Sequence, residues 1–121
     1  MTIQIHYKSR QANREAYWSE PVLETLSETH VQLHSSVRET LNQIADVTSD
    51  EHCSDSVALA LIYQTFNHDT ANPLSAYHVS GGLQDWMNDA GIGHTSMSRN
   101  DVVCINGTYY ACESTGWTIL N

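Results

Sequence analysis

The chain has 121 residues, of which 40% are hydrophobic and 16% are charged, and this size and composition are typical of one globular domain with its own core. Its formal net charge of −9 disfavours direct binding to nucleic acids and membrane surfaces, because both are negatively charged. No apolar run approaches the roughly eighteen residues of a membrane-spanning helix, and the first residues lack the pattern of a secretion signal. We therefore expect a single cytoplasmic domain over residues 1–121.

The first third of the chain predicts two strands with helical residues between them. Apolar and polar residues alternate over residues 3–7, which indicates a half-buried strand. Residues 10–18 predict a short helix or loop that ends in an inward-packing Tyr17-Trp18 pair. A helix start with proline in its first turn predicts a helix over residues 20–28. Alternation resumes over residues 29–34 and predicts a second strand.

The middle of the chain predicts three helices. Ser36 begins a capping-box pattern, and an apolar stripe follows over residues 37–47. Residues 55–66 are the most apolar segment, which indicates a central core helix. A third, short helix is expected over residues 83–90, with Gly91 placed to end it.

The strongest local signal is a β-hairpin around Asn106-Gly107, a pair typical of a two-residue type I′ turn. The turn sets the register, which pairs Ile105 with Thr108, Cys104 with Tyr109 and Val103 with Tyr110. Both faces of the hairpin are fairly apolar, so we expect either a cover on each face or a contact with another subunit. With a last strand at residues 117–120, the fold class is α+β: a small mixed domain of about three to four helices and a short antiparallel sheet that ends in a C-terminal β-hairpin.

Residues 94–104 read His-Thr-Ser-Met-Ser-Arg-Asn-Asp-Val-Val-Cys, and Tyr-Tyr-Ala-Cys and Gly-Trp follow at residues 109–112 and 116–117. This pattern resembles the small YodL-like proteins of phages and plasmids, whose C-termini look like H-T-S-M-S-V-G-D-V-V, a short turn, Y-Y-x-C and then G-W or G-F. The resemblance covers about residues 25–121. Here Arg-Asn-Asp at 99–101 replaces V-G-D, and asparagine is the best non-glycine residue at a left-handed position. The resemblance implies a mobile-element accessory protein, a class that interferes with host machinery or host defence.

The negative charge is concentrated after residue 38, because residues 39–121 hold ten acidic residues and one base, Arg99. The candidate binding residues are Asp46, Asp50, Glu51, Asp55, Asp69, Asp85 and Asp89. If folding gathers them on one side, they suit a host protein with a basic surface. The hypothesis is an inhibitor of a host defence factor, anti-CRISPR-like or a nucleic-acid mimic. The alternative explanation is that acidity keeps the protein soluble. A solvated helix face equally accounts for Glu20, Glu24 and Glu28.

A second hypothesis concerns a small ligand. The hydroxyl groups of Thr95, Ser96 and Ser98 could hydrogen-bond a phosphate beside Arg99. Together with the two-faced apolar hairpin, this segment predicts a homo-oligomer that sequesters a nucleotide signal. Salt separates the two hypotheses, because binding through an acidic patch weakens as ionic strength rises.

Residue patterns for catalysis, metal binding or cofactor binding are weak. His30 and His34 lie too far apart along an extended chain to chelate one ion, so a solvent-facing pair is expected. His52-Cys53 are sequence neighbours, which rarely point at each other as a nucleophile and its base do. Gly81-Gly82 lacks the lysine and hydroxyl residue of a phosphate-binding loop. We therefore expect a protein that is not an enzyme and has no metal or cofactor.

Overall fold

The computed structural model describes residues 2–33, 38–50, 55–68, 71–72, 87–92 and 96–120. Its elements, in chain order, are β1 (Ile3–Lys8), α1 (Arg10–Ala16), the 3₁₀ turn η1 (Leu23–Thr25), α2 (Leu26–Thr29), β2 (His30–Gln32), α3 (Arg38–Asp50), α4 (Asp55–Phe66), β3 (Val102–Ile105), β4 (Thr108–Cys112) and β5 (Trp117–Ile119). Residues 87–90 are also helical. This mixture of helices and strands confirms the expected α+β class.

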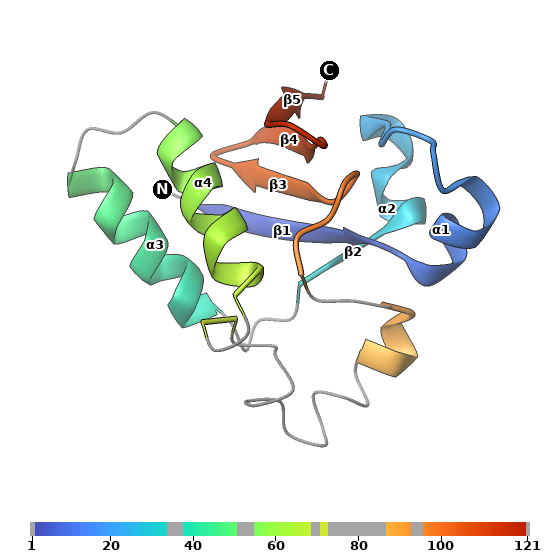
Figure 1. Cartoon of the computed structure of the whole chain (residues 1–121), viewed down its shortest axis with the longest axis horizontal. Coiled ribbons are helices and arrows are strands. Elements are labelled where there is room, and N and C mark those ends of the chain that lie inside the picture. The colour runs from blue at the N-terminus through green and yellow to red at the C-terminus, as the bar shows by residue number, and fades with distance from the viewer. Residues whose placement is uncertain are drawn as a thin grey trace.

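The strands form one antiparallel sheet in the order β2-β1-β3-β4-β5, with the N-terminal strand inside it (Figure 1). β1 pairs with β2 on one side and with β3 on the other, where Ile3 lies opposite Ile105. The C-terminal half of the sheet is a simple meander from β3 to β5.

The β3–β4 hairpin has the predicted register. Ile105 lies opposite Thr108. Cys104 lies opposite Tyr109, and Val103 lies opposite Tyr110. Asn106 and Gly107 both have positive φ, 48° and 88°, as a type I′ turn requires. The alternation of the strands places Cys104 and Cys112 on opposite faces, and both are free thiols.

The main core lies between α3, α4 and one face of the sheet (Figure 1). The alternate residues Ile5 and Tyr7 of β1 are fully buried there, and so are Ile62 of α4 and Val103 of β3. The apolar stripe of α3 and the buried residues of α4 meet the sheet on this face, which confirms the helices expected at residues 37–47 and 55–66. α3 continues three residues further than expected, to Asp50.

The segment that carries α1, η1 and α2 lies on the opposite face of the sheet, where Leu23 and Leu26 line a pocket together with His6 of β1 and Tyr109 of β4. Lys8 follows Tyr7 on β1 and therefore points to this second face, where its ammonium group reaches the backbone of Ala16 and Ser19. Val102 and Val103 are neighbours on β3, and both are fully buried. We expected the apolar hairpin either to be covered on both faces or to contact another subunit. For β3 the first explanation applies, because residues of the same chain bury both of its faces.

The prediction that Tyr17 and Trp18 pack inward is wrong. Tyr17 is 60% exposed and Trp18 is 73% exposed. The reason is that the backbone carbonyl groups of this segment face the sheet, where Lys8 binds those of Ala16 and Tyr17. The two aromatic side chains consequently point outward.

The expected helix over residues 20–28 is shorter and interrupted. Val22 is extended, at φ −119° and ψ 128°, so the helical residues begin only with η1 and continue as α2. The carbonyl of Ser19, the expected start, instead accepts hydrogen bonds from Lys8 and Asn100.

Other expectations meet mixed outcomes. The prediction that His30 faces solvent is wrong, because only 7% of it is exposed. The short helix before Gly91 is confirmed at residues 87–90, and Gly91 ends it at φ 74°. Ser36, His34, Cys53 and Gly81-Gly82 lie outside the described residues.

Candidate functional site

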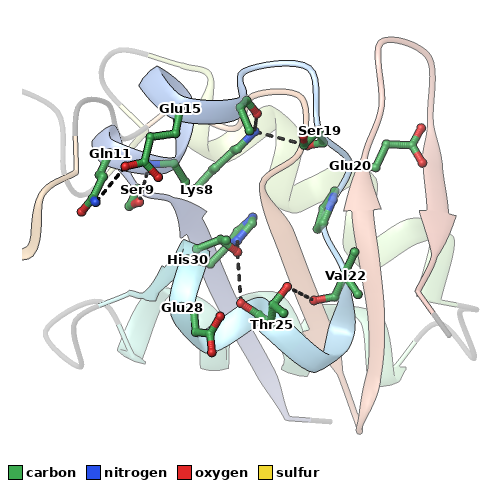
Figure 2. A pocket seen from close by; sticks show the side chains of 14 residues that line it. Lys8, Ser9, Gln11, Glu15, Ser19, Glu20, Val22, Thr25, Glu28 and His30 are labelled. Carbon is green, nitrogen blue, oxygen red and sulfur yellow. Dashed lines mark hydrogen bonds between the residues drawn. The ribbon is translucent and has the colours of Figure 1, made fainter.

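A cavity of about 330 Å³ opens between α1 and the segment that runs from Ser19 through α2 (Figure 2). Lys8 and His30, at the ends of two paired strands, form its inner wall. Gln11 and Glu15 of α1 stand on one side. The other side is lined by residues 20–22, Thr25 and Glu28. The cavity therefore lies where the second layer of the fold meets the sheet.

The side chain of Lys8 caps the C-terminal end of α1. The residue is buried, with 4% of its surface exposed. Its ammonium group donates hydrogen bonds to the carbonyl oxygens of Ala16 at 2.7 Å and of Tyr17 and Ser19 at 3.2 Å. The last carbonyls of a helix lack partners within the helix, and a cation satisfies them. Burial lowers the pKa of Lys8, although the carboxylate of Asp101 acts in the opposite direction.

Asp101 fastens the loop before β3 to β1. It is fully buried, and its two carboxylate oxygens accept the backbone N–H groups of Lys8 and Ser98, each at 2.8 Å. Its own backbone carbonyl accepts the N–H of Cys112 at 2.8 Å. The carboxylate of Asp101 thus ties β1 to the loop before β3, and its backbone carbonyl ties that loop to β4.

Asn100 occupies a left-handed position, with φ 72°, as expected for the residue that replaces glycine in the family pattern. Its carbonyl oxygen lies 2.7 Å from Nε2 of His30. A carbonyl can only accept, so Nε2 carries the proton, and Nδ1 is free to accept from the hydroxyl of Thr29, 2.7 Å away. Burial lowers the pKa of His30, which favours this neutral form.

The cavity is acidic. Among the described residues that line it, Glu15, Glu20 and Glu28 are exposed carboxylates, and Lys8 is the one lysine or arginine. Figure 2 shows the three carboxylates on different sides of the opening, from α1, from the connecting segment and from α2. Gln11 donates to Glu15 at 3.0 Å. Since the nitrogen atoms of Lys8 and His30 are already hydrogen-bonded, this arrangement favours attraction of a cation over proton transfer.

An apolar ridge adjoins the cavity. It consists of the exposed side chains of Tyr17, Trp18, Val22 and Leu23, and we call it the 17–23 ridge. The rings of Tyr17 and Trp18 pack edge to face, with 4.8 Å between their centres. The guanidinium carbon of Arg99 lies 5.6 Å from the centre of the Trp18 ring, within cation–π range. Sequence reasoning missed this ridge, because its aromatic pair alone does not indicate which way it points.

The acidic residues expected to bind a partner lie on separate elements where they are described. Asp46 is exposed on α3, and Asp50 is the last residue of that helix. Asp55 begins α4, half-buried, and accepts a hydrogen bond from the Tyr110 hydroxyl. Asp89 is exposed on the helical residues 87–90, which Figure 1 places far from α3. Glu51, Asp69 and Asp85 lie outside the described residues.

The residues expected to bind a phosphate lie in the loop before β3. Ser96 is exposed, Ser98 is half-buried, and Thr95 lies outside the described residues. The side chain of Arg99 faces Glu113, with 3.8 Å between Nε and Oε2. The charged partners of this loop are thus the carboxylates of Glu113 and Asp101, which repel a phosphate.

Within the part of the chain that the structure describes, no three His, Cys, Asp or Glu side chains gather as metal ligands, and no helix combines the length and apolarity needed to cross a bilayer. Comparisons of the chain with protein families, with characterised proteins and with solved structures find no match. The candidate site therefore rests on the geometry of the cavity and of the ridge beside it.

Proposed function

We propose that the protein acts by binding rather than by catalysis, and that its target is a protein with a basic surface. In line with the resemblance to YodL-like proteins, we further propose a phage or plasmid accessory protein that works in the host cytoplasm. By occupying a basic site it would inhibit a host defence factor, as an anti-CRISPR or a nucleic-acid mimic does. The observation that carries the proposal is the cavity lined by Glu15, Glu20 and Glu28.

The electrostatics of the cavity support a cationic partner. A cleft lined by charges of one sign focuses the field and attracts ligands of the opposite sign. Three carboxylates line this cavity against one ammonium group, and the whole chain carries a net charge of −9. Both the local and the overall field therefore attract lysine and arginine side chains and repel nucleic acids.

The surface of the N-terminal third is more acidic than its composition suggests. Residues 1–38 contain four acidic and four basic residues, but Lys8 is buried and its ammonium binds backbone carbonyls. Arg10 directs its guanidinium group to the carbonyl of Ile92 at 2.8 Å. The four glutamates of this region are all exposed, and so are Arg10, Arg14 and Arg38. The burial of Lys8 therefore leaves a small excess of carboxylates at the surface of this region.

A pull-down from host lysate tests the proposal. We expect the tagged protein to capture a basic host protein at low salt and to lose it at high salt, because exposed charges are screened. The variant E15Q/E20Q/E28Q should lose capture. The matched control E39Q/D46N/D89N removes three exposed acids elsewhere and should retain it.

Three results would contradict the proposal. Capture that resists salt would exclude an acidic interface. Loss of capture in the control but not in the cavity variant would move the interface to the acidic residues that follow α2. A nucleotide that co-purifies without a protein partner would replace the proposal with the nucleotide-sequestering alternative.

A further inference from the structure

We infer that the 17–23 ridge and the carboxylate-lined cavity form one docking surface, for a segment of the partner protein in which a lysine or arginine is flanked by large apolar side chains. The inference rests on the proposed binding of a basic protein and specifies what the partner presents. Its apolar side chains would cover the ridge, and its cation would enter the cavity.

The exposure of the ridge is the first argument. Trp18 is 73% exposed, Tyr17 60% and Val22 53%. Large apolar side chains exposed within one short stretch of chain are typical of interaction sites on soluble proteins. Tryptophan, tyrosine and arginine are also the residue types that contribute most to binding energy at protein interfaces, and Arg99 stands beside Trp18. The ridge thus has the composition of an interface centre.

The ridge is held in place from below, which is the second argument. Lys8 fixes the carbonyl oxygens of Tyr17 and Ser19, and the side-chain amide of Asn100 donates to the Ser19 carbonyl at 3.2 Å. Both Lys8 and Asn100 are buried. Because the backbone is tied to the sheet, docking would order little that is not already ordered, and a preorganised surface binds at a lower entropic cost.

Continuity with the cavity identifies the occupant. Ser19, Glu20 and Val22 line the cavity and belong to the same stretch of chain as the ridge. An apolar surface alone would accept any apolar segment. Here the adjoining carboxylates of Glu15, Glu20 and Glu28 favour a segment that also carries a cation. Charge complementarity therefore selects a basic, apolar segment over a neutral or acidic one.

Three capped tripeptides test the inference by titration of ¹⁵N-labelled full-length protein, with chemical shifts followed at millimolar peptide concentrations. N-acetyl-Leu-Arg-Leu amide should perturb the ridge and the residues that line the cavity. N-acetyl-Gly-Arg-Gly amide lacks the apolar flanks, and N-acetyl-Leu-Gln-Leu amide lacks the charge. We expect each of these to bind at least about fivefold more weakly, which is the scale of a single significant interface contact.

Variants locate the binding. Trp18→Ala should weaken Leu-Arg-Leu about fivefold and leave Gly-Arg-Gly unchanged. The matched control is Tyr63→Ala, because Tyr63 is an aromatic residue of α4 that is 46% exposed, and it should have no effect. Both side chains are largely exposed, so neither substitution should unfold the protein.

The outcomes separate this inference from the proposed function. Equal affinities for the two arginine peptides, or an unchanged affinity in Trp18→Ala, would overturn the ridge while the acidic interface stands. Equal affinities for Leu-Arg-Leu and Leu-Gln-Leu would overturn the role of charge in docking at this surface, whereas the proposed function would still be tested by salt-sensitive capture from lysate. Absence of binding by all three peptides would overturn the docking surface, whereas salt-sensitive capture from lysate would still support the proposed function.

Discussion

Replacement of Asp101 by alanine tests how the loop before β3 is attached to β1. The carboxylate of Asp101 is fully buried and accepts the backbone N–H groups of Lys8 and Ser98, each at 2.8 Å. Alanine leaves both donors in place but removes both acceptors. The buried ammonium group of Lys8 also loses a neighbouring negative charge.

The magnitude follows from the two orphaned donors. A buried N–H without a partner costs about 1–3 kcal/mol, so Asp101→Ala should lower the free energy of unfolding by about 2–6 kcal/mol. This is a large part of the roughly 5–15 kcal/mol of a typical domain. Asp101→Asn keeps one acceptor oxygen and should cost about half as much. With a urea m-value of about 1.5 kcal/mol/M, a loss of about 3 kcal/mol lowers the unfolding midpoint by about 2 M.

Urea denaturation followed by circular dichroism provides the measurement. Asp89→Ala removes an exposed carboxylate and serves as the control, with an expected change within about 0.5 kcal/mol. A loss below about 1 kcal/mol in Asp101→Ala would refute the reasoning, because it would mean that the two N–H groups find other partners. Equal losses in the alanine and asparagine variants would refute the assignment of the cost to unpaired donors.

Three further predictions follow from the same region. Burial lowers the pKa of His30 and of His6 below 6.5, and His30 further lowers that of His6. The unfolded chain therefore binds more protons than the folded one, and the free energy of unfolding should fall as the pH drops from about 7.5 through 6.5. Urea titrations at several pH values measure how the free energy of unfolding depends on pH. An unchanged pH dependence in His30→Gln would contradict the prediction. Asn100→Ala should cost about 1 kcal/mol more than Asn100→Gly, because alanine is strained at φ 72°, and equal midpoints would exclude that strain. Burial raises the pKa of Cys112 to about 11, so mass spectrometry should find Cys112 alkylated by iodoacetamide at pH 8 only after unfolding, whereas rapid labelling of the native protein would show an accessible thiol.

Local patterns were sufficient to predict the parts of the fold whose geometry is set within a few residues. The turn at Asn106-Gly107 and the period of two in β3 and β4 determine the hairpin register, and the structure has that register. The positive φ of Asn100 was expected from the resemblance, in which this residue stands at a glycine position and asparagine tolerates the left-handed region. The apolar stripe of α3 likewise depends only on helical periodicity, and α4 was expected because its segment is the most apolar of the chain.

The candidate site depends on contacts between segments, and these were not predictable from local patterns. Lys8 ends a strand and, by alternation, would face solvent, but α1 folds back and places its last carbonyls over the ammonium group. The outward direction of Trp18 and the burial of His30 follow from the same fold-back. Glu15 and Glu28 come together around one cavity although they belong to different helices, so no spacing rule connects them.

The position of β1 inside the sheet has a consequence for how the chain is made. The residues of β1 leave the ribosome well before those of β3, although β3 is one of its two neighbours and Ile105 lies opposite Ile3. At a synthesis rate of about 5–20 residues per second, the first strand waits about 5–20 s for that neighbour. Pairing so distant in sequence also slows folding, since a long loop must close before any contact is gained. The nascent chain therefore exposes the apolar face of this inner strand until the residues of β3 have been made.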